Sequence, residues 1–183
     1  MGKDRQTAFN RAVTVLQARG IDVSKAKFLD RTVYINFDAK GAASKVDLID
    51  SNTKKLEGIT NFDGPQLNAN RHWVIDSISI KGDDEATAFG KAKWKSALHP
   101  ALLNSEIRFS QDGTLIDMPV TDLHNVDGIG GLDDDFREMI HAPVVVPNLD
   151  MKLEWVFPKG ESVPGSVTSS LVNIRFRVIE AFV

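Results

Sequence analysis

Four histidines are the side chains of this sequence best suited to metal binding or to proton transfer near neutral pH. They are His72, His99, His124 and His141, and none stands in an HExxH or another zinc-ligand spacing. The chain has no cysteine, which excludes disulfides and thiolate metal sites. We therefore predict no metal site on these histidines and expect them in turns and at the surface.

Two acidic clusters contain enough carboxylates to suggest a calcium site. They are Asp83–Glu85 and Asp133–Asp135, and each begins a stretch with helical features, over 83–97 and over 133–140. Within the first stretch, the alternation of lysines with Ala92 and Trp94 also allows a strand. Acidic side chains in the first turn of a helix accept backbone N–H groups and are stabilised by the helix dipole. Because neither cluster has EF-hand spacing, we predict two helix N-termini, with Ca²⁺ at Asp133–Asp135 as the alternative.

The remaining motifs do not indicate a reaction centre. The glycine-rich loop Asn125–Leu132 lacks the Gly-Lys-Ser/Thr of a P-loop, and the sequence contains no GxSxG. A carboxylate pair for glycoside hydrolysis would come from separate strands, and no pattern singles one out. We expect no enzyme, no cofactor and no small-molecule substrate. An enzyme on a β-sandwich or cupin-like barrel would need histidines and carboxylates that converge in the fold.

Three tryptophans are candidates for a platform on which a sugar could stack. Trp73 and Trp155 lie within strand-like stretches, so we predict that both belong to the core. Trp94 stands between two lysines, and we predict that it is the exposed one.

The length and composition fit one soluble domain. The chain has 183 residues, of which 42% are hydrophobic and 26% charged. No apolar run approaches the roughly 18–20 residues of a membrane span, and the first residues lack the apolar segment of a secretory signal. Residues 1–31 carry seven basic and three acidic side chains, although the whole chain has a net charge of −3. A basic arm on an acidic body suits an anionic partner.

The N-terminal arm is predicted to be helical over Asp4–Arg19, with Gly20 as its C-cap. Its narrow apolar face suits a surface, either of its own sandwich or of another subunit. The candidate interface residues on this arm are the apolar stripe and two arginines that we expect to face either the interior of an assembly or an acidic neighbour: Phe9, Ala12, Val13, Leu16, Arg5 and Arg11.

Beyond the arm, apolar residues recur with the period of two that is typical of half-buried strands. The Asp-Gly pair in Ser105–Val120 predicts a hairpin, because a type I′ turn needs positive φ at both central residues. The other predicted strands are Thr32–Phe37, Val46–Ile49 and Arg71–Ile80. The alternation of Arg71–Ile80 slips between Ile75 and Ile78, which indicates a bulge or burial on both faces. The stretch Ala142–Pro147 is predicted as an edge strand or an extended connection.

The last two strand-like stretches, Asn148–Phe157 and Leu171–Phe182, alternate most regularly. We predict that they form a long antiparallel pair within one sheet, and that the second ends the chain without a catalytic tail. With seven to nine short strands and few helices, the sequence predicts an all-β, mainly antiparallel sandwich over 26–183 behind a helical arm over 1–25.

This layout resembles the single jelly-roll capsid proteins of tailless icosahedral viruses and bacteriophages. The resemblance is carried by the helical arm Asp4–Arg19, the hairpin Ser105–Val120 and the two closing strands. It implies a jelly-roll shell or vertex subunit of a virion, assembled in the host cytoplasm, whose partners are copies of itself and other virion proteins.

The arm departs from the long basic arms of many shell proteins, because it is short and helical. We therefore expect it to clamp subunits, with only weak contact to genome or membrane headgroups. Deleting residues 1–20 should then leave the sandwich folded but stop assembly. We expect the loops Asn125–Leu132 and Lys159–Ser170 at the ends of the sandwich, where subunits or hosts are met. The main alternative is a carbohydrate- or receptor-binding β-sandwich module with an exposed aromatic platform.

Overall fold

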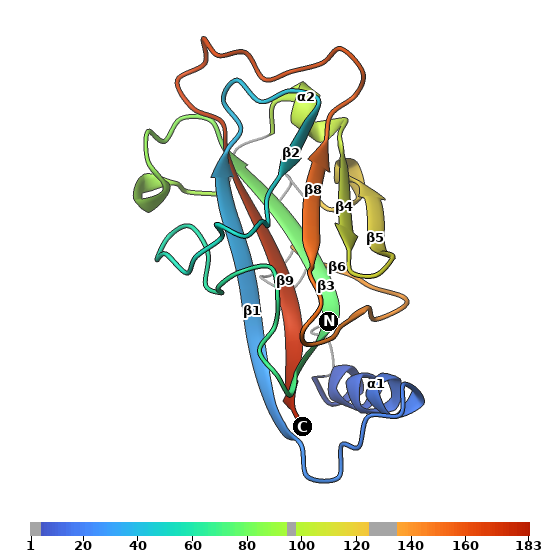
Figure 1. The fold of residues 1–183 in the computed structure, drawn as a ribbon. Helices are drawn as coiled ribbons and strands as arrows, with labels where there is room; N and C mark the ends of the chain where they lie inside the picture. Colours follow the sequence, from blue (N-terminus) through green and yellow to red (C-terminus); the bar gives the residue numbers. More distant parts are fainter. Residues whose placement is uncertain (1–4, 95–97, 125–134) are drawn as a thin grey trace.

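The computed structural model describes residues 5–94, 98–124 and 135–183 as two antiparallel sheets packed face to face (Figure 1). The helix α1 (Arg5–Ala18) lies against one end of the larger sheet. The larger sheet contains β1 (Lys27–Asp38), β3 (Arg71–Asp83), β6 (Arg137–Glu138), β7 (Val144–Val145) and β9 (Leu171–Phe182). The smaller sheet contains β2 (Lys45–Asp47), β4 (Glu106–Ser110), β5 (Thr114–Pro119) and β8 (Lys152–Val156). Short helical turns are η1 (Phe89–Lys91), α2 (Pro100–Leu103) and η2 (Val120–Asp122). The predicted mainly antiparallel β fold with an N-terminal helix is confirmed.

The strand order is nested along the chain. The larger sheet reads β1-β9-β3-β6, with β7 also paired to β3, and the smaller sheet reads β2-β8-β4-β5. The first strand thus pairs with the last, the second pairs with β8, the third pairs with β6 and β7, and β4 pairs with β5. All these pairs are antiparallel.

The core lies between the two sheets. Alternate residues of the long strands point inward, as the period of two predicted, and aromatic rings fill the centre. Trp155 is fully buried, with its ring centroid 5.5 Å from that of Phe37. Trp73 is also buried and meets Phe62 edge to face, so the prediction that both tryptophans belong to the core is confirmed.

Several local predictions are confirmed by the backbone. The β4–β5 hairpin turns through Asp112 and Gly113, which have φ values of 48° and 132°. The register of β3 against β9 shifts between Ile75 and Ser77, where the sequence predicts a bulge. The helix α1 ends at Ala18, and Gly20, the predicted C-cap residue, follows it with φ 76°.

The prediction for the two closing strands is wrong, because β8 and β9 belong to different sheets. β8 pairs with β2 and β4, whereas β9 pairs with β1 and β3. The connection between them crosses from one sheet to the other at the upper end of Figure 1. Alternation shows which face of a strand is buried, but it does not show which strands are its neighbours.

The helix predicted over 83–97 is absent from the part that the structure describes, which ends at Trp94 before the gap at 95–97. This segment is irregular, with the single turn η1. The Asp83 carboxylate organises it by accepting N–H groups from Glu85 at 3.0 Å, Ala86 at 2.8 Å and Lys93 at 2.6 Å. Burial alone would raise the pKa of Asp83, but these backbone donors lower it overall. Asp83 therefore caps a loop, where the sequence predicted a helix cap.

The helix predicted over 133–140 is also wrong for its described part, 135–140. Arg137–Glu138 pairs with β3 as the strand β6, and the Met139 N–H donates to the Asp76 carbonyl at 2.9 Å. Phe136 lies under the guanidinium groups of Arg175 and Arg177. Met139 is buried, whereas Ile140 is 94% exposed. Asp133 and Asp134 lie outside the described residues, so the calcium alternative at Asp133–Asp135 is untested.

The outer face of the smaller sheet carries paired charges. The Glu154 carboxylate contacts the ammonium groups of Lys45 and Lys152, each at 2.7 Å. Hydrogen bonds from Lys152 and Lys45 lower the pKa of Glu154 to about 2. This face is therefore polar, whereas the outer face of the larger sheet receives the apolar side of α1.

Candidate functional site

The outer face of the larger sheet under α1 brings together most of the candidate interface residues. Ala12 and Leu16 are 1% and 0% exposed, and they pack against a second apolar cluster with Val74, Val144 and Ala181. The helix therefore docks on its own sheet, one of the two surfaces that its apolar stripe predicts. Helix packing of this kind is stabilised mainly by the buried apolar area.

The other two members of the stripe are only half-buried. The Phe9 ring meets the Phe28 ring of β1 edge to face, with centroids 5.0 Å apart. Val13 is half-buried on the same helix. Both side chains remain within reach of a neighbouring molecule.

Arg11 faces an acidic side chain, and that side chain belongs to its own sheet. Its guanidinium forms an ion pair with Asp76 and donates to the Met139 carbonyl at 2.7 Å. Asp76 lies at the bulge of β3 and is 6% exposed. The pair therefore fixes α1 to the bulge and to the segment that leads into β7. The side chain of Arg5 lies outside what the structure describes.

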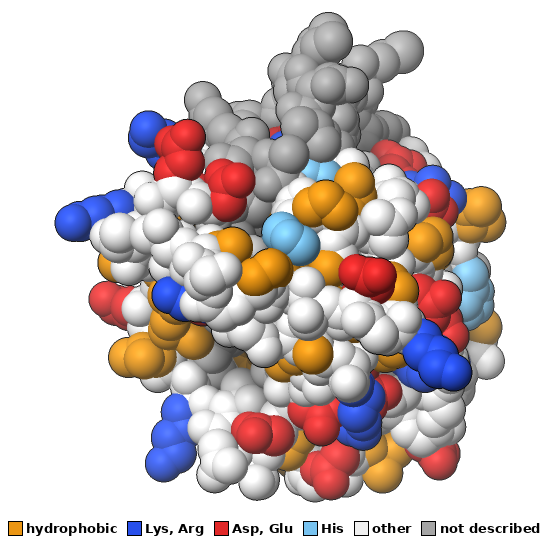
Figure 2. Space-filling model, turned by 90° about the horizontal axis from the view of Figure 1, so that it is seen from above, with side chains coloured by type: hydrophobic (Ala, Val, Ile, Leu, Met, Phe, Trp, Pro, Cys, Tyr) orange, Lys and Arg blue, Asp and Glu red, His pale blue; other side chains and the backbone are white. Residues whose placement is uncertain are grey.

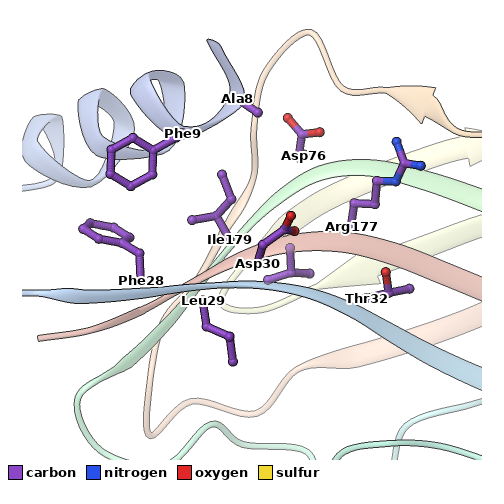
Figure 3. A pocket seen from close by; sticks show the side chains of 10 residues that line it. Ala8, Phe9, Phe28, Leu29, Asp30, Thr32, Asp76, Arg177 and Ile179 are labelled. Atoms are coloured by element: carbon purple, nitrogen blue, oxygen red, sulfur yellow. The ribbon is translucent and has the colours of Figure 1, made fainter. Parts of the chain in front are cut away.

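A pocket of about 520 Å³ opens between the first turns of α1 and the outer face of the larger sheet (Figure 3). One end of the pocket is apolar, with Phe9, Phe28 and Ile179. The other end is polar, with Asp30 and Thr32 from β1. A pocket with these two ends suits a ligand that is itself part apolar and part polar.

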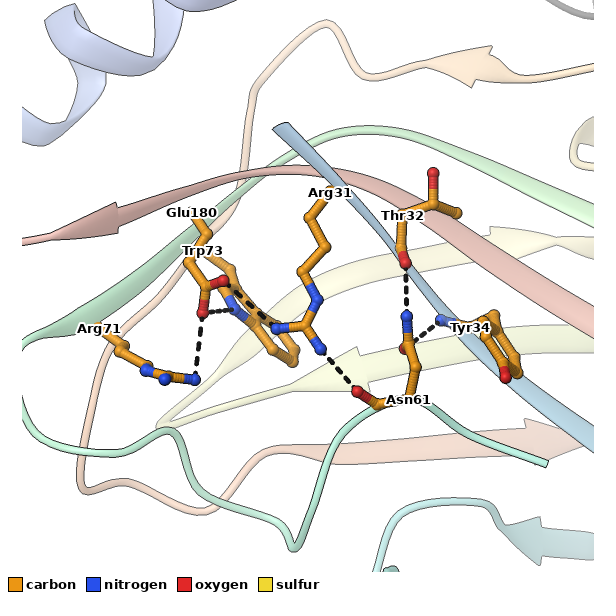
Figure 4. Close-up of polar contacts among 7 residues, drawn as sticks. All are labelled: Arg31, Thr32, Tyr34, Asn61, Arg71, Trp73 and Glu180. Atoms are coloured by element: carbon orange, nitrogen blue, oxygen red, sulfur yellow. Dashed lines mark hydrogen bonds and ion pairs between the residues drawn. The ribbon is translucent and has the colours of Figure 1, made fainter. Parts of the chain in front are cut away.

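Three side chains, those of Trp73, Arg31 and Arg71, converge on the inner face of the larger sheet around the buried carboxylate of Glu180 (Figure 4). Glu180 is 1% exposed and accepts the Trp73 indole N–H at 3.0 Å. The guanidinium groups of Arg31 and Arg71 lie 3.3 and 3.6 Å from its two oxygens. Arg31 also donates to the Asn61 carbonyl at 2.6 Å. This cluster ties β9, β1 and β3 to the loop that covers them.

The Glu180 cluster was not predicted, although the sequence contains a signal for it. Glu180 falls in phase with the inward residues Ile174, Phe176 and Val178. A buried carboxylate needs cationic or N–H partners. The position of Glu180 in the strand alternation therefore predicts that residues from elsewhere in the chain contact it.

The histidines do not converge, and the described residues contain no group of three potential metal ligands. His99 caps α2 by accepting the Ala101 N–H at 3.2 Å, and His141 is exposed, as predicted for turn and surface roles. His72 is half-buried within β3. His124 is 9% exposed, which is contrary to the surface role expected for it, and its Nδ1 lies 3.0 Å from the Ile80 carbonyl.

Acidification is expected to destabilise the fold through His124. Burial lowers the pKa of this imidazole, so the fold favours its neutral form. Its contribution to stability is complete above the unfolded pKa of about 6.5 and is lost as the pH falls below that value. Urea unfolding at pH 7.5 and pH 5.5 measures the loss.

The variant His124→Asn should show a smaller loss between these two pH values. Part of the loss should remain, because burial also lowers the pKa of His72. Equal losses in the variant and the natural sequence would show that His124 is not the titrating group. Glu154 does not interfere, since its contribution falls only below pH 4.5.

No match was found when the chain was compared with protein-family models, with curated proteins and with solved structures. Among the described residues, no helix reaches the length and apolarity needed to cross a bilayer. Function therefore has to be inferred from the strand order and from the surfaces described above.

Proposed function

We propose that the protein is a structural virion protein, a shell or vertex subunit built on a single jelly roll. The nested strand pairing carries this proposal. If β6 and β7 are counted as one strand, the eight strands read 1-8-3-6 in one sheet and 2-7-4-5 in the other. Such an order arises when one long antiparallel ribbon of paired strands wraps around a common core. Jelly rolls of this kind recur in viral capsid proteins.

The surface gives secondary support for a protein that packs against copies of itself. Ile140 is 94% exposed beside Met139, whose carbonyl binds the α1 side chain Arg11, so a large apolar side chain projects near the helix. The loop 157–170 lies at the upper end of Figure 1, as expected for Lys159–Ser170. Figure 2 shows that this end mixes both charge signs with scattered apolar side chains. The companion loop Asn125–Leu132 lies outside the described residues.

Jelly rolls also occur in lectins, so the carbohydrate-binding alternative shares the fold. That alternative needs an exposed aromatic platform. Trp73 and Trp155 are 4% and 0% exposed, and Trp94 is half-buried, where the sequence predicted exposure. We therefore favour the virion role.

The mass of the purified protein in solution tests this role. Sedimentation velocity and electron microscopy of the full chain should show closed particles or a defined oligomer at micromolar concentration. A monomer at every concentration that binds to a glycan array would instead support the carbohydrate-binding alternative and would contradict the shell role.

The α1 helix should be required for assembly. Deleting residues 1–20 uncovers Val74, Val144 and Ala181, so we expect lower thermal stability with both sheets retained, and no assembly. A milder pair of variants separates folding from assembly. Val13→Lys charges the half-buried stripe, whereas Gln17→Lys adds the same charge at an exposed position of the helix. Of these two variants, Val13→Lys should fail to assemble and Gln17→Lys should assemble normally. Assembly by the deletion variant would disprove the clamping role.

A further inference from the structure

The strand β1 lies at the edge of the larger sheet. Its upper half in Figure 1, from Thr32 onward, is covered by the segment that contains Ile59 and Asn61. There the even-numbered residues direct their backbone polar groups away from β9. The Asn36 N–H donates to the Ile59 carbonyl at 2.7 Å, and the Tyr34 N–H donates to Asn61 Oδ1 at 3.1 Å. Asn61 Nδ2 in turn donates to the Thr32 carbonyl at 2.7 Å (Figure 4). The segment around Asn61 thus covers this part of the edge, a common protection against unwanted strand pairing.

The lower half of the same edge is open. By the same alternation, Phe28 and Asp30 direct their backbone N–H and C=O groups away from β9. No hydrogen bond to these groups is found among the described residues. Open backbone groups at a sheet edge are a template for another strand.

The pocket under α1 lies beside this open half. Figure 3 shows Phe28 and Asp30 rising from β1 toward the helix, whereas Leu29 points away. Phe28 borders the apolar end together with Phe9. The Asp30 carboxylate is exposed at the polar end and has no ion pair or hydrogen bond within the described residues. Open backbone hydrogen-bonding groups of β1, the aromatic ring of Phe28 and the unpaired carboxylate of Asp30 therefore lie next to one another.

We propose that the open half of β1, Phe28–Asp30, binds an extended segment of another polypeptide as an added antiparallel strand. Side chains directly opposite each other in such a pair lie on the same face, about 4.5–5.5 Å apart. The added strand would place Lys or Arg opposite Asp30 and an aromatic or aliphatic side chain opposite Phe28. Because the strands are antiparallel, the basic residue precedes the apolar one by two positions. This site does not depend on the proposed shell function.

A second copy of β1 fits this edge poorly. Two-fold pairing of β1 with itself, centred on Leu29, would place Asp30 opposite Phe28 and Lys27 opposite Arg31. Like charges directly opposite each other are destabilising in a sheet. The charge pattern therefore favours a different chain with a basic residue as the occupant.

The test uses a labelled peptide, fluorescein-Gly-Thr-Lys-Thr-Phe-Thr-Gly-amide, and the full chain in a fluorescence anisotropy titration. The peptide should bind, and replacing its Lys by Glu should weaken binding about three- to tenfold. Asp30→Lys should reverse this preference, so that the Glu peptide binds better. Asp84→Lys makes the same change at an exposed position just beyond the far end of β3 and should leave the preference unchanged.

Backbone methylation distinguishes strand addition from side-chain binding alone. The Lys and Phe amides of the peptide would face β1, whereas the Thr amides would face solvent. N-methylation of the Lys and Phe amides should weaken binding by about tenfold or more, and N-methylation of the Thr amides should have little effect. Absence of binding, or equal sensitivity to the two methylation patterns, would overturn the proposal. An oligomer of the natural sequence that Asp30→Pro dissociates would show that a second copy occupies the edge.

Discussion

Replacing Glu180 by alanine is expected to destabilise the fold by about 3–5 kcal/mol. The variant would leave the guanidinium groups of Arg31 and Arg71 without their carboxylate, and the buried indole N–H of Trp73 without an acceptor. Removing one member of a buried charge cluster costs more than the cluster contributes, because the remaining groups stay desolvated. Equilibrium unfolding in urea measures the change.

Two variants control this prediction. Glu180→Gln keeps an acceptor for the indole and removes only the charge, so its loss of stability should be intermediate. Glu106→Ala removes a carboxylate that is 56% exposed and lies 3.7 Å from Arg108, and it should change stability by less than about 1 kcal/mol. If Glu180→Ala and Glu106→Ala cost the same, the cluster does not stabilise the end of the sandwich.

Replacing Trp155 by alanine is expected to have a comparable effect, about 3–5 kcal/mol. The indole is fully buried at the centre of the core, beside the ring of Phe37. Its removal leaves a cavity that β2 and β4, paired on either side of β8, cannot fill without breaking their pairing. The loss of stability should appear in thermal and urea unfolding alike.

The matched substitution is Trp94→Ala. Trp94 is half-buried in an irregular segment, so the same change in side-chain volume should cost much less than at Trp155. A larger loss for Trp94→Ala than for Trp155→Ala would mean that the centre of the core lies elsewhere.

Features set by neighbouring residues could be predicted from the sequence. Gly20 ends α1 because the Gly20 and Ile21 N–H groups donate to the Gln17 and Leu16 carbonyls at 2.9 and 3.1 Å, a pattern that needs positive φ. The turn at Asp112-Gly113 follows from the same chemistry. These signals act over a few residues, and tertiary contacts did not override them.

The features that could not be predicted depend on partners far along the chain. Asp83 is a residue type that favours helix N-caps, but its carboxylate accepts the N–H of Lys93, ten residues away, and so stabilises a loop. The partner of Arg11 is Asp76, 65 residues later, which lies at the bulge of β3. The alternation of apolar residues does not predict to which face of the sheet a side chain at a bulge points. The open part of the β1 edge could not be predicted for the same reason. Which part of the edge is covered depends on Asn61, a residue of a distant loop.

The nested strand order determines when this polypeptide can fold during its synthesis. The strand β9 lies between β1 and β3, and Lys27 pairs with Phe182 across nearly the whole chain. The larger sheet therefore cannot close until residues 171–182 have left the ribosome, and contacts between such distant residues make folding slow. Until then β1 and β3 both lack their central partner, so the nascent chain carries unpaired strands that a chaperone or a neighbouring chain on the same polysome can capture.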